Sequence, residues 1–468
     1  MGLLVWAVAC GGTDNPETAA RWESGSVGPL AAEIPAGEFR NRRERLLAAL
    51  PDGITLLHAR PAPKTETEWG FVQDPSFYYF TGIGDLTGAV VALDGPASQV
   101  VLFLPPAPES FGFPVPGLVP PANDDTAREL GMDAVHPWDH LAVWVDDRLA
   151  AGVAAIYVDE ARRPEPPGVP SSFSATSGAL SLWASALEER FPSATFRSAK
   201  EAIHDLRWRK SPAEAAILRA NAANTAVALA EVARAVQPGM RQRQAEAVVV
   251  ASCIEGGGEG PSFWPWVMSG PNAQLDGLVQ AFFRYSQLDR VMREGEVIRV
   301  DIGCAGQGYG ADVGRTLPVS GTFTEGQAEA WNLVVAGYEA GLAAMSHGVP
   351  IRTVREASTA AVQAGVPALR TNQGRLAART ILDGGDGIWH IHGIGIESGE
   401  DAATVLEEGA VVAYEPMVAA GEDTFYLEDM ILITSDGAEV LSDGLPRSAA
   451  GLEAMMRGES GPVRPDRR

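Results

Sequence analysis

The sequence predicts an α+β protein, in which a smaller α/β domain precedes a larger domain of helices grouped around antiparallel hairpins. Three observations support this. The chain has 468 residues, more than one ordinary hydrophobic core contains. Before residue 200 or so, short apolar runs alternate with helical patterns, as in a small sheet with helices on its faces. Further along, capped helical patterns accompany strand-like runs that read as hairpins.

Composition narrows the class of protein. Apolar residues make up 46% of the chain and charged residues 21%, which is typical of a soluble globular protein. There are 60 acidic residues against 36 basic ones, a net charge of −24. This charge argues against nucleic acid or an anionic membrane surface as a partner. It mildly favours cationic substrates, such as peptides with a free amino end.

Residues 1–33 are expected to form a lipoprotein-like signal and tether. The apolar run from Leu3 to Ala9 ends at "AVAC", and a polar stretch follows. This resembles a bacterial lipoprotein signal with Cys10 as the lipidated residue, and the run is too short to span a bilayer. Lipidation would tether the protein to a membrane in the cell envelope. The alternative is an irregular N-terminus with a chance cysteine, in which case a cytoplasmic location is expected.

The first domain is expected over residues 34–206. Its opening stretch "EFRNRRERLLAAL" predicts a helix with Leu46, Leu47 and Leu50 on one side. Strand-like runs and one further helical pattern follow, separated by loops rich in Pro and Gly. The predicted strands are 54–58, 88–94, 99–104 and 154–158, and the predicted helix is 178–191.

The second domain is expected over residues 207–447, followed by a polar tail at 448–468. It opens on "SPAE", a capping box in which Ser211 caps the helix and Glu214 reaches back. Further helices are predicted up to the glycines at 256–258, from "TEGQ" at 324–327 to about 347, and over 351–365. The predicted strands are "EVIRVDIG", "YGADVGRTLPV", "AVVAYEPM" and "FYLEDMILIT". We expect Cys253 and Cys304 to be buried free thiols, because two cysteines are too few for a disulfide scaffold.

Four of these strands each carry one acid in an apolar setting. Unpaired buried carboxylates cost several kcal/mol each, and a shared cation would offset that cost. Any one of the acids by itself could instead lie on a solvated face or in a local ion pair. His392 in "WHIHGIGIE" adds an imidazole, and oxygen ligands with one imidazole suit Mn, Co, Fe or Zn better than Ca or Mg. The acids are Asp301, Asp312, Glu415 and Glu428.

Glycines flank Asp312 on its own face of the predicted strand. In "GYGADVG", side chains alternate between the two faces, so Gly310 and Gly314 share the face of Asp312. Their missing side chains leave room for something bulky near Asp312.

These motifs resemble the pita-bread metallopeptidases, which include aminopeptidase P, prolidase, methionine aminopeptidase and the related creatinase. The contexts "VDIG…GYGADVGRT", "HGIGIE", "YEP" and "LED…ILIT" carry the resemblance, as does the ligand order Asp, Asp, His, Glu, Glu. The stretches "LRWRKSPAEAAILRANA" and "SGPNA" are similar to the entry into that domain. "FRNRRERLLAALPDGITLL" and "QDPSFYYFTGI" resemble the N-terminal domain of aminopeptidase P. The resemblance covers about residues 34–447, and it implies a C-terminal pita-bread domain, a curved antiparallel sheet covered by helices.

The resemblance implies a dinuclear metal-dependent peptidase of the Xaa-Pro aminopeptidase type. Asp312 and Glu428 would bridge two divalent ions, with Mn preferred and Co, Zn or Fe as alternatives. Asp301 would complete one coordination sphere, and His392 with Glu415 the other. Glu415 would also be catalytic, handling a proton as a metal-bridged hydroxide attacks the scissile carbonyl of a small peptide. Relatives are often homodimers or homotetramers.

The chain departs from the family around the predicted metals. The peptidases usually add two histidines, but here Arg284 precedes Tyr285 in one context and Gly399 stands at the other position. His390 could substitute for a lost histidine, or it could be bonded to backbone. Arg284 could be an oxyanion donor, although a surface charge is favoured.

Tyr426 stands where the family has arginine. It could donate a hydroxyl, although simple packing is favoured. Trp264, Trp266 and Trp389 could line a substrate pocket or belong to an aromatic core.

Two other functions stay open because the accessory histidines are missing. One is a metallohydrolase on the same metal platform with a shifted substrate, such as a dipeptide or a non-peptide amide. The other is a catalytically degenerate, surface-tethered binding protein.

Overall fold

A computed structural model describes residues 34–61, 72–107, 109–110, 113–114, 119–159 and 179–464. The predicted leader and Cys10 lie outside these residues. Among the residues described, no helix combines the length and the apolar character that crossing a bilayer requires.

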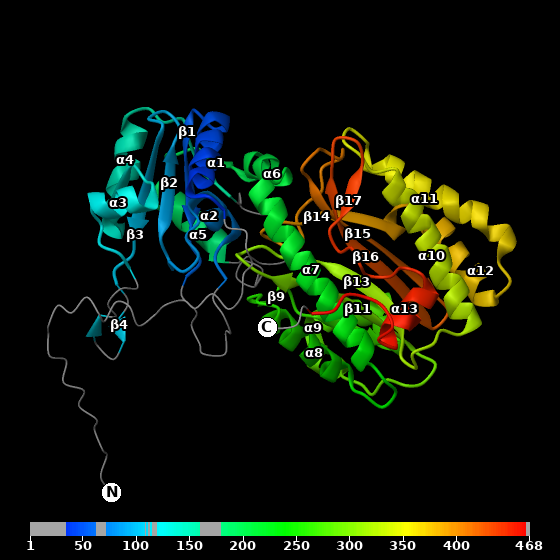
Figure 1. Ribbon diagram of the computed structural model, residues 1–468. Coiled ribbons are helices and arrows are strands. Elements are labelled where there is room, and N and C mark those ends of the chain that lie inside the picture. Colours follow the sequence, from blue (N-terminus) through cyan, green and yellow to red (C-terminus); the bar gives the residue numbers. More distant parts are fainter. Residues whose placement is uncertain are drawn as a thin grey trace, which may run out of the picture.

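The first domain is built on a six-stranded sheet with the order β6-β3-β2-β1-β7-β8. The predicted runs form its central strands, and apolar side chains bury both faces. Figure 1 shows this domain, coloured blue to green, at the left. The strands are β1 (Gly53–His58), β2 (Val90–Asp94), β3 (Gln99–Leu104), β6 (Ala134–Pro137), β7 (Ala155–Val158) and β8 (Phe196–Ser198). The helices are α1 (Ala36–Ala49), α2 (Pro75–Thr81), α3 (Asp124–Leu130), α4 (Leu141–Ala150) and α5 (Ala179–Arg190).

The first domain meets the second through a buried arginine. Helix α6 (Lys200–Trp208) leads to α7 (Pro212–Ala235), whose capping box of Ser211 and Glu214 is formed. Arg42 of α1 is buried; it donates to the carbonyl of Tyr79 at 3.0 Å and pairs with Glu214 at 3.3 Å. Glu214 also accepts from the Tyr309 hydroxyl at 3.0 Å. The carboxylate of Glu214, which caps helix α7, therefore also links the two domains through Arg42.

The second domain is an antiparallel sheet with the order β10-β11-β13-β16-β15-β14, and β17 pairs with β16. The strands are β10 (Trp266–Ser269), β11 (Val297–Ile302), β13 (Val313–Pro318), β14 (Trp389–Gly393), β15 (Val411–Ala420), β16 (Asp423–Ile433) and β17 (Ala438–Val440). The helices are α7, α8 (Gln242–Glu255), α9 (Leu275–Arg284), α10 (Glu325–Ala343), α11 (Ile351–Gly365) and α12 (Asn372–Gly384). The predicted fold class is confirmed.

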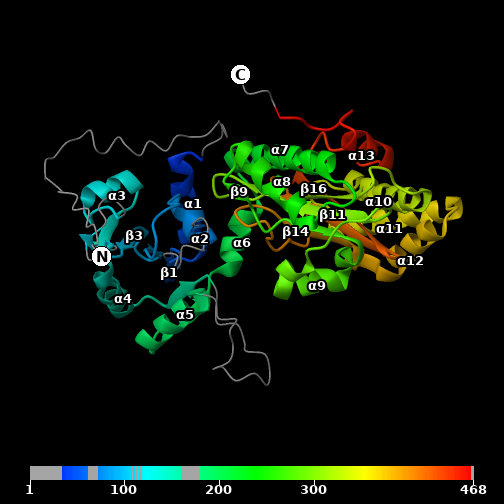
Figure 2. The ribbon, with the colours of Figure 1, turned by 90° about the horizontal axis from the view of Figure 1, so that it is seen from below.

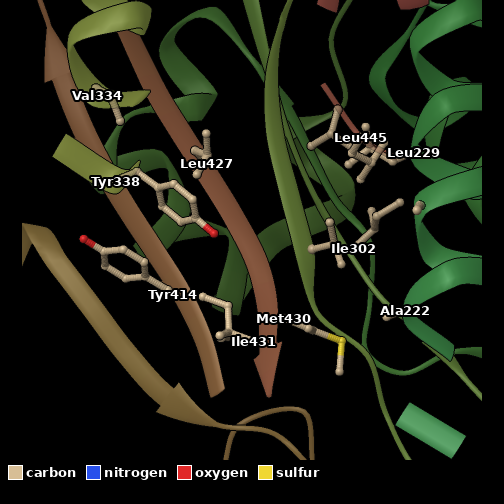
Figure 3. Packing of buried hydrophobic residues seen from close by; sticks show 14 of the residues in the cluster. Ala222, Leu229, Ile302, Val334, Tyr338, Tyr414, Leu427, Met430, Ile431 and Leu445 are labelled. Atoms are coloured by element: carbon tan, nitrogen blue, oxygen red, sulfur yellow. The ribbon is translucent and has the colours of Figure 1, made fainter. Parts of the chain in front are cut away.

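Helices that include α7 and α10 bury one face of this sheet, and the acidic residues lie on the opposite face. Ile302 of β11 packs with Leu229 of α7 in the core of the domain (Figure 3). Further along the sheet, the rings of Tyr338 and Tyr414 stack at 4.8 Å between centroids. Asp301 projects to the opposite face from Ile302, because adjacent strand residues alternate. Helices α7 and α9 lie on opposite sides of the sheet (Figure 2).

The segment after residue 448 differs from the expected polar tail. Helix α13 (Ala449–Met456) forms there, and it buries Ala449, Leu452 and Met455 in the core of the second domain. Its apolar residues recur every three positions, so they line one side of a helix. Helix α13 thus extends the packed domain beyond residue 447.

The expectation that Cys253 and Cys304 are free thiols is wrong. They form a disulfide, with Cα atoms 5.3 Å apart and 51 residues of sequence separation. Two short strands bring them together: β9 (Gly260–Pro261) follows α8 and pairs with β12 (Cys304–Ala305), which follows β11. Cysteine number alone did not reveal this contact, because it depends on a pairing between distant segments.

Candidate metal centre

The strand register places the predicted residues in a row across the sheet. Asp301 of β11 pairs with Gly314 of β13, and Gly314 pairs with Glu428 of β16. On the next strand, Tyr414 pairs with Asp429 and Met417 with Tyr426. Glu415 and Glu428 therefore face each other between these two pairs. Directly opposed residues share a face of an antiparallel sheet, so these carboxylates converge on one side.

His392 lies among the carboxylates. Its Nε2 is 3.3 Å from Glu415 Oε1, 3.8 Å from Glu428 Oε1 and 3.9 Å from Asp312 Oδ2. Asp312 immediately precedes β13, so its side chain lies on the same face as Gly314. The structure thus brings Asp312, His392, Glu415 and Glu428 together. Asp301 joins them from the neighbouring strand.

The electrostatics of this cluster fit a cation. Asp312 Oδ1 and Glu428 Oε1 are buried without a hydrogen-bond partner, although unpaired buried oxygens are costly. Burial, reinforced by neighbouring negative charge, raises the pKa of Asp312, Asp301 and Glu428. A positive charge placed between these groups would pair the unpaired oxygens and would favour the ionised form of the carboxyl groups. The donor set of carboxylates with an imidazole suits a transition-metal dication.

His392 and Glu415 interact as a positively charged imidazole and a negatively charged carboxylate. Burial acts to lower the pKa of His392, but hydrogen bonds with Glu415 and Glu428 outweigh it and raise the pKa to about 10. Burial acts to raise the pKa of Glu415, but hydrogen bonds with His390 and His392 hold it well below its usual range. An ionised Glu415 is the form that ligates a metal.

Tyr426 takes part in the site, so the expectation that it only packs is wrong. Its hydroxyl donates to Glu415 Oε2 at 2.6 Å and to Glu428 Oε2 at 2.8 Å. The ring occupies the space left by Gly314, where an added Cβ would come 2.1 Å from the Tyr426 ring. The bulky group expected beside the glycines is therefore this tyrosine.

Arg299 is a site residue that the sequence reasoning missed. It is buried, its Nη1 lies 3.3 Å from Asp301 Oδ2, and its guanidinium lies 5.3 Å from the centre of the Tyr426 ring. It shares the face of Asp301, two residues away on β11. That spacing was the available signal, because an arginine on an acidic strand face invites an ion pair.

The remaining predicted residues lie further from the cluster or on its rim. His390 Nδ1 contacts Glu415 Oε1 at 2.6 Å. Arg284 ends α9, is exposed and bonds to Gln280, which agrees with a surface charge. Nothing lies within 4 Å of a Cβ added to Gly399, so no described side chain fills that position.

The tryptophans divide between rim and core. Trp389 is fully buried and belongs to the core. Trp266 of β10 pairs with Asp301 and therefore lies at the edge of the site. Trp264 is exposed.

A cleft of about 1020 Å³ opens beside the centre, between the two domains. It reaches Gly310, two residues before Asp312, and Gly399. Tyr78 of the first domain lines it and donates to the carbonyl of Gln307 in the second at 3.0 Å. The carboxylates of Glu259 and Glu397 also line the cleft. Arg60 lines it as well, and its volume suits a short peptide.

Comparison with known proteins agrees with this architecture. Residues 216–435 match metallopeptidase family M24, and residues 39–154 match the aminopeptidase P N-terminal domain. The Xaa-Pro aminopeptidase of Escherichia coli is 25% identical over 454 residues, covering 91% of this chain and 98% of that protein. The structure of Escherichia coli aminopeptidase P with the inhibitor Pro-Leu aligns with a TM-score of 0.70 and 24% identity, covering 92% of this chain and 99% of the other. Proline aminopeptidase P II from Yersinia pestis aligns with a TM-score of 0.71 and 23% identity, covering 91% and 100%.

The fold and the donor set are those of a metal-dependent hydrolase. The chain belongs to the pita-bread metallopeptidase family, and its two domains are those of the aminopeptidase P type. It is a metallo-aminopeptidase that uses divalent metal ions. The alternative of a degenerate binding protein has no support in these comparisons.

Proposed function

We propose that the protein is a Xaa-Pro aminopeptidase that uses two divalent ions, with Mn²⁺ preferred. Asp301, Asp312, His392, Glu415 and Glu428 would hold the ions. The observation that carries this proposal is the pair of orphaned carboxylate oxygens, on Asp312 and Glu428, beside a cleft of peptide size. Bound dications would polarise a carbonyl and lower the pKa of a water molecule.

The chain's own residues would bind the peptide and move the proton. Glu259 in the cleft would offer negative charge to the free amino end of a substrate, whereas Glu397 is already paired with Arg207 at 2.7 Å. Glu415 is the candidate to handle the proton; its Oε1 faces His390 and His392, and its Oε2 contacts Tyr426. The Tyr426 hydroxyl holds Glu415 and Glu428 at a fixed separation. The first domain lines one side of the cleft, in part through Tyr78.

The test is cleavage by metal-loaded protein. Protein stripped with a chelator and reloaded with Mn²⁺ or Co²⁺ should bind about two ions and release the N-terminal residue from Xaa-Pro peptides. Matched Xaa-Ala peptides should be cleaved more slowly. An Asp312→Asn variant controls for contaminating peptidases. Absence of cleavage of every Xaa-Pro peptide by protein shown to hold metal would reject the proposal.

A shifted substrate is the second candidate, favoured by the open position at Gly399 and the exposed Arg284. Losing one donor to the developing oxyanion costs on the order of a hundredfold in rate. A panel of dipeptides and non-peptide amides, assayed with the same metal-loaded protein, distinguishes the two. Faster turnover of one of these than of any Xaa-Pro peptide would favour the second candidate.

We further propose that the protein is a lipid-anchored or periplasmic protein of the cell envelope, tethered through Cys10. The Cys253–Cys304 disulfide supports this proposal, because disulfides persist in oxidising compartments. Membrane fractionation of the native protein and of a Cys10→Ala variant tests it: the variant should move to the soluble fraction. A homodimer or homotetramer is also proposed, and sedimentation of the purified protein would test it.

A further inference from the structure

We propose that His390 is a sixth metal ligand, which gives one of the two ions a pair of imidazoles. The inference rests on the proposed dinuclear centre and adds a residue to it. It assigns to this chain a His-x-His pair on β14 that faces a carboxylate on β15.

The register of the sheet places His390 in the row of candidate ligands. His390 pairs directly with Glu415, and His392 pairs with Ala413. Side chains two residues apart on a strand share a face, and the rings of His390 and His392 lie 5.5 Å apart between centroids. Trp389 and Ile391, which alternate with them, are buried in the core on the other face. The strand therefore presents both imidazoles to the acidic side.

The donor atoms are close enough for one ion. Glu415 Oε1 is 2.6 Å from His390 Nδ1 and 3.3 Å from His392 Nε2. The three residues each offer a ligand atom, all within 4.8 Å of one another. Donors around a four-coordinate zinc ion lie about 3.4 Å apart, because metal–nitrogen bonds are about 2.1 Å long. Modest opening of the His390–Glu415 contact would reach that spacing.

His392 offers one ligand atom to two overlapping donor sets, and because its Nε2 has a single lone pair it would bind one of the two ions, the one shared with His390 and Glu415. Asp312, His392 and Glu428 form the second set within the same 4.8 Å limit. Removal of His390 leaves that set complete and affects only the set with Glu415. His390 is more than half exposed, with 56% of its side-chain surface accessible, so ligation there costs little desolvation. Two imidazoles with a carboxylate suit Zn²⁺ or Co²⁺ better than Mn²⁺.

The competing role for His390 is a hydrogen bond that only orients Glu415. Loss of such a partner lowers metal affinity by about 10- to 100-fold, so affinity alone does not separate the two roles. The number of imidazoles bound to metal does separate them. His390→Asn keeps a short donor at the position, whereas His390→Ala removes it. His347→Ala is the matched control, because His347 is a surface histidine bonded to the backbone amide of Glu408 at 3.1 Å.

The experiment uses the full chain, stripped of metal and reloaded with Co²⁺. Titration calorimetry gives the stoichiometry and affinities, and paramagnetic proton NMR counts the ligating imidazoles by their hyperfine-shifted ring signals. We expect signals from both imidazoles in the unaltered protein and in His347→Ala, and signals from His392 alone in both His390 variants. We also expect about tenfold or greater weakening for one ion in the His390 variants. Circular dichroism confirms that each variant is folded.

Three outcomes would overturn the proposal or its basis, and they are distinguishable. Signals from one imidazole in the unaltered protein, with weaker binding only in His390→Ala, would show that His390 merely orients Glu415. Identical titrations and spectra for the unaltered protein and His390→Ala would show that His390 has no role at the metal centre. Failure of the unaltered protein to bind Co²⁺ or Zn²⁺ would reject the proposed metal centre itself.

Discussion

The ring of Tyr426, on strand β16, fills the space that a side chain at Gly314 would occupy on the neighbouring strand β13. A Cβ on Gly314 would come 2.1 Å from the ring, and the ring's hydroxyl donates to Glu415 and Glu428. The absence of a side chain at Gly314 therefore allows the Tyr426 hydroxyl to reach Glu415 and Glu428.

Gly314→Ala should therefore displace Tyr426 and weaken the centre. Overpacking of a closed core costs about 1 to 3 kcal/mol, and the variant should lose that much in its free energy of unfolding by urea. Its metal affinity should fall as well. Gly37→Ala is the control, because Gly37 lies in α1 with nothing within 4 Å of an added Cβ. A Gly314→Ala variant with unchanged stability and metal affinity would contradict the proposed arrangement.

Tyr426→Phe should keep the packing and lose the donor. Two buried carboxylate oxygens then lack a partner, and metal affinity should fall by about 10- to 100-fold. Calorimetric titration with Mn²⁺ measures this change. Tyr414→Phe is the matched control, because the Tyr414 hydroxyl bonds Ser358 in the core at 2.5 Å. Equal metal affinities in the two variants would show that the Tyr426 hydroxyl has no role at the centre.

The disulfide between Cys253 and Cys304 should stabilise the second domain. Loss of a crosslink that closes a loop of 51 residues costs about 4 kcal/mol in the chain-entropy description. We expect the double variant Cys253→Ala, Cys304→Ala to unfold at a lower urea concentration, with a free energy of unfolding about 4 kcal/mol smaller than that of the unaltered protein. Addition of a reductant should destabilise the unaltered protein and leave the double variant unchanged. Reaction of both Cys253 and Cys304 with a thiol reagent in unfolded, unreduced protein would contradict the crosslink.

Acid should weaken the ion pairs that Glu400 makes with the end of helix α6 and the segment joining it to α7. Its carboxylate accepts from Lys210 Nζ at 2.8 Å and from Arg207 at 2.6 Å. Burial acts to raise the pKa of Glu400, but the charges of Lys210 and Arg207 outweigh it and lower the pKa from 4.5 to about 2. A group whose pKa is lower in the folded state contributes its stability above the unfolded value and loses it as pH falls.

Lowering the pKa of Glu400 from 4.5 to about 2 corresponds to about 3 kcal/mol of stability at neutral pH. That contribution should disappear between about pH 4.5 and pH 2. Urea unfolding across this range measures it, and Glu400→Gln should reduce the slope of stability against pH there. Glu439→Gln is the control, because Glu439 and Arg219 form an exposed ion pair, and its effect should stay within about 1 kcal/mol. An unchanged slope in Glu400→Gln would contradict the assignment.

The sequence predicted the helices and strands that depend on residues close together in the chain. The capping boxes at Ser211 and Thr324 begin helices α7 and α10, as expected from the reach of a side chain to the third amide. The apolar runs became the central strands of both sheets. The sequence does not predict helix α13, because its apolar pattern spans only 8 residues. Helix α9 was also not predicted, although its residues follow the motif "SGPNA".

Contacts between distant segments account for the remaining errors. The role of Tyr426 depends on the space over Gly314, on a different strand. The crosslink of Cys253 with Cys304 depends on the pairing of β9 with β12. Arg299 and Asp301 are two residues apart, yet their burial next to Tyr426 follows from the order of the strands.

By itself, the sequence determined the fold class and the family and predicted which residues are offered to a metal, because residue type, spacing and hydrophobic period are written along the chain. Only the tertiary structure decided which of those residues face one another, that Tyr426 takes the space over Gly314, and that His390 stands opposite Glu415. The physical reason is that cross-strand register joins residues far apart in sequence, and burial of the whole sheet, rather than any local pattern, fixes that register.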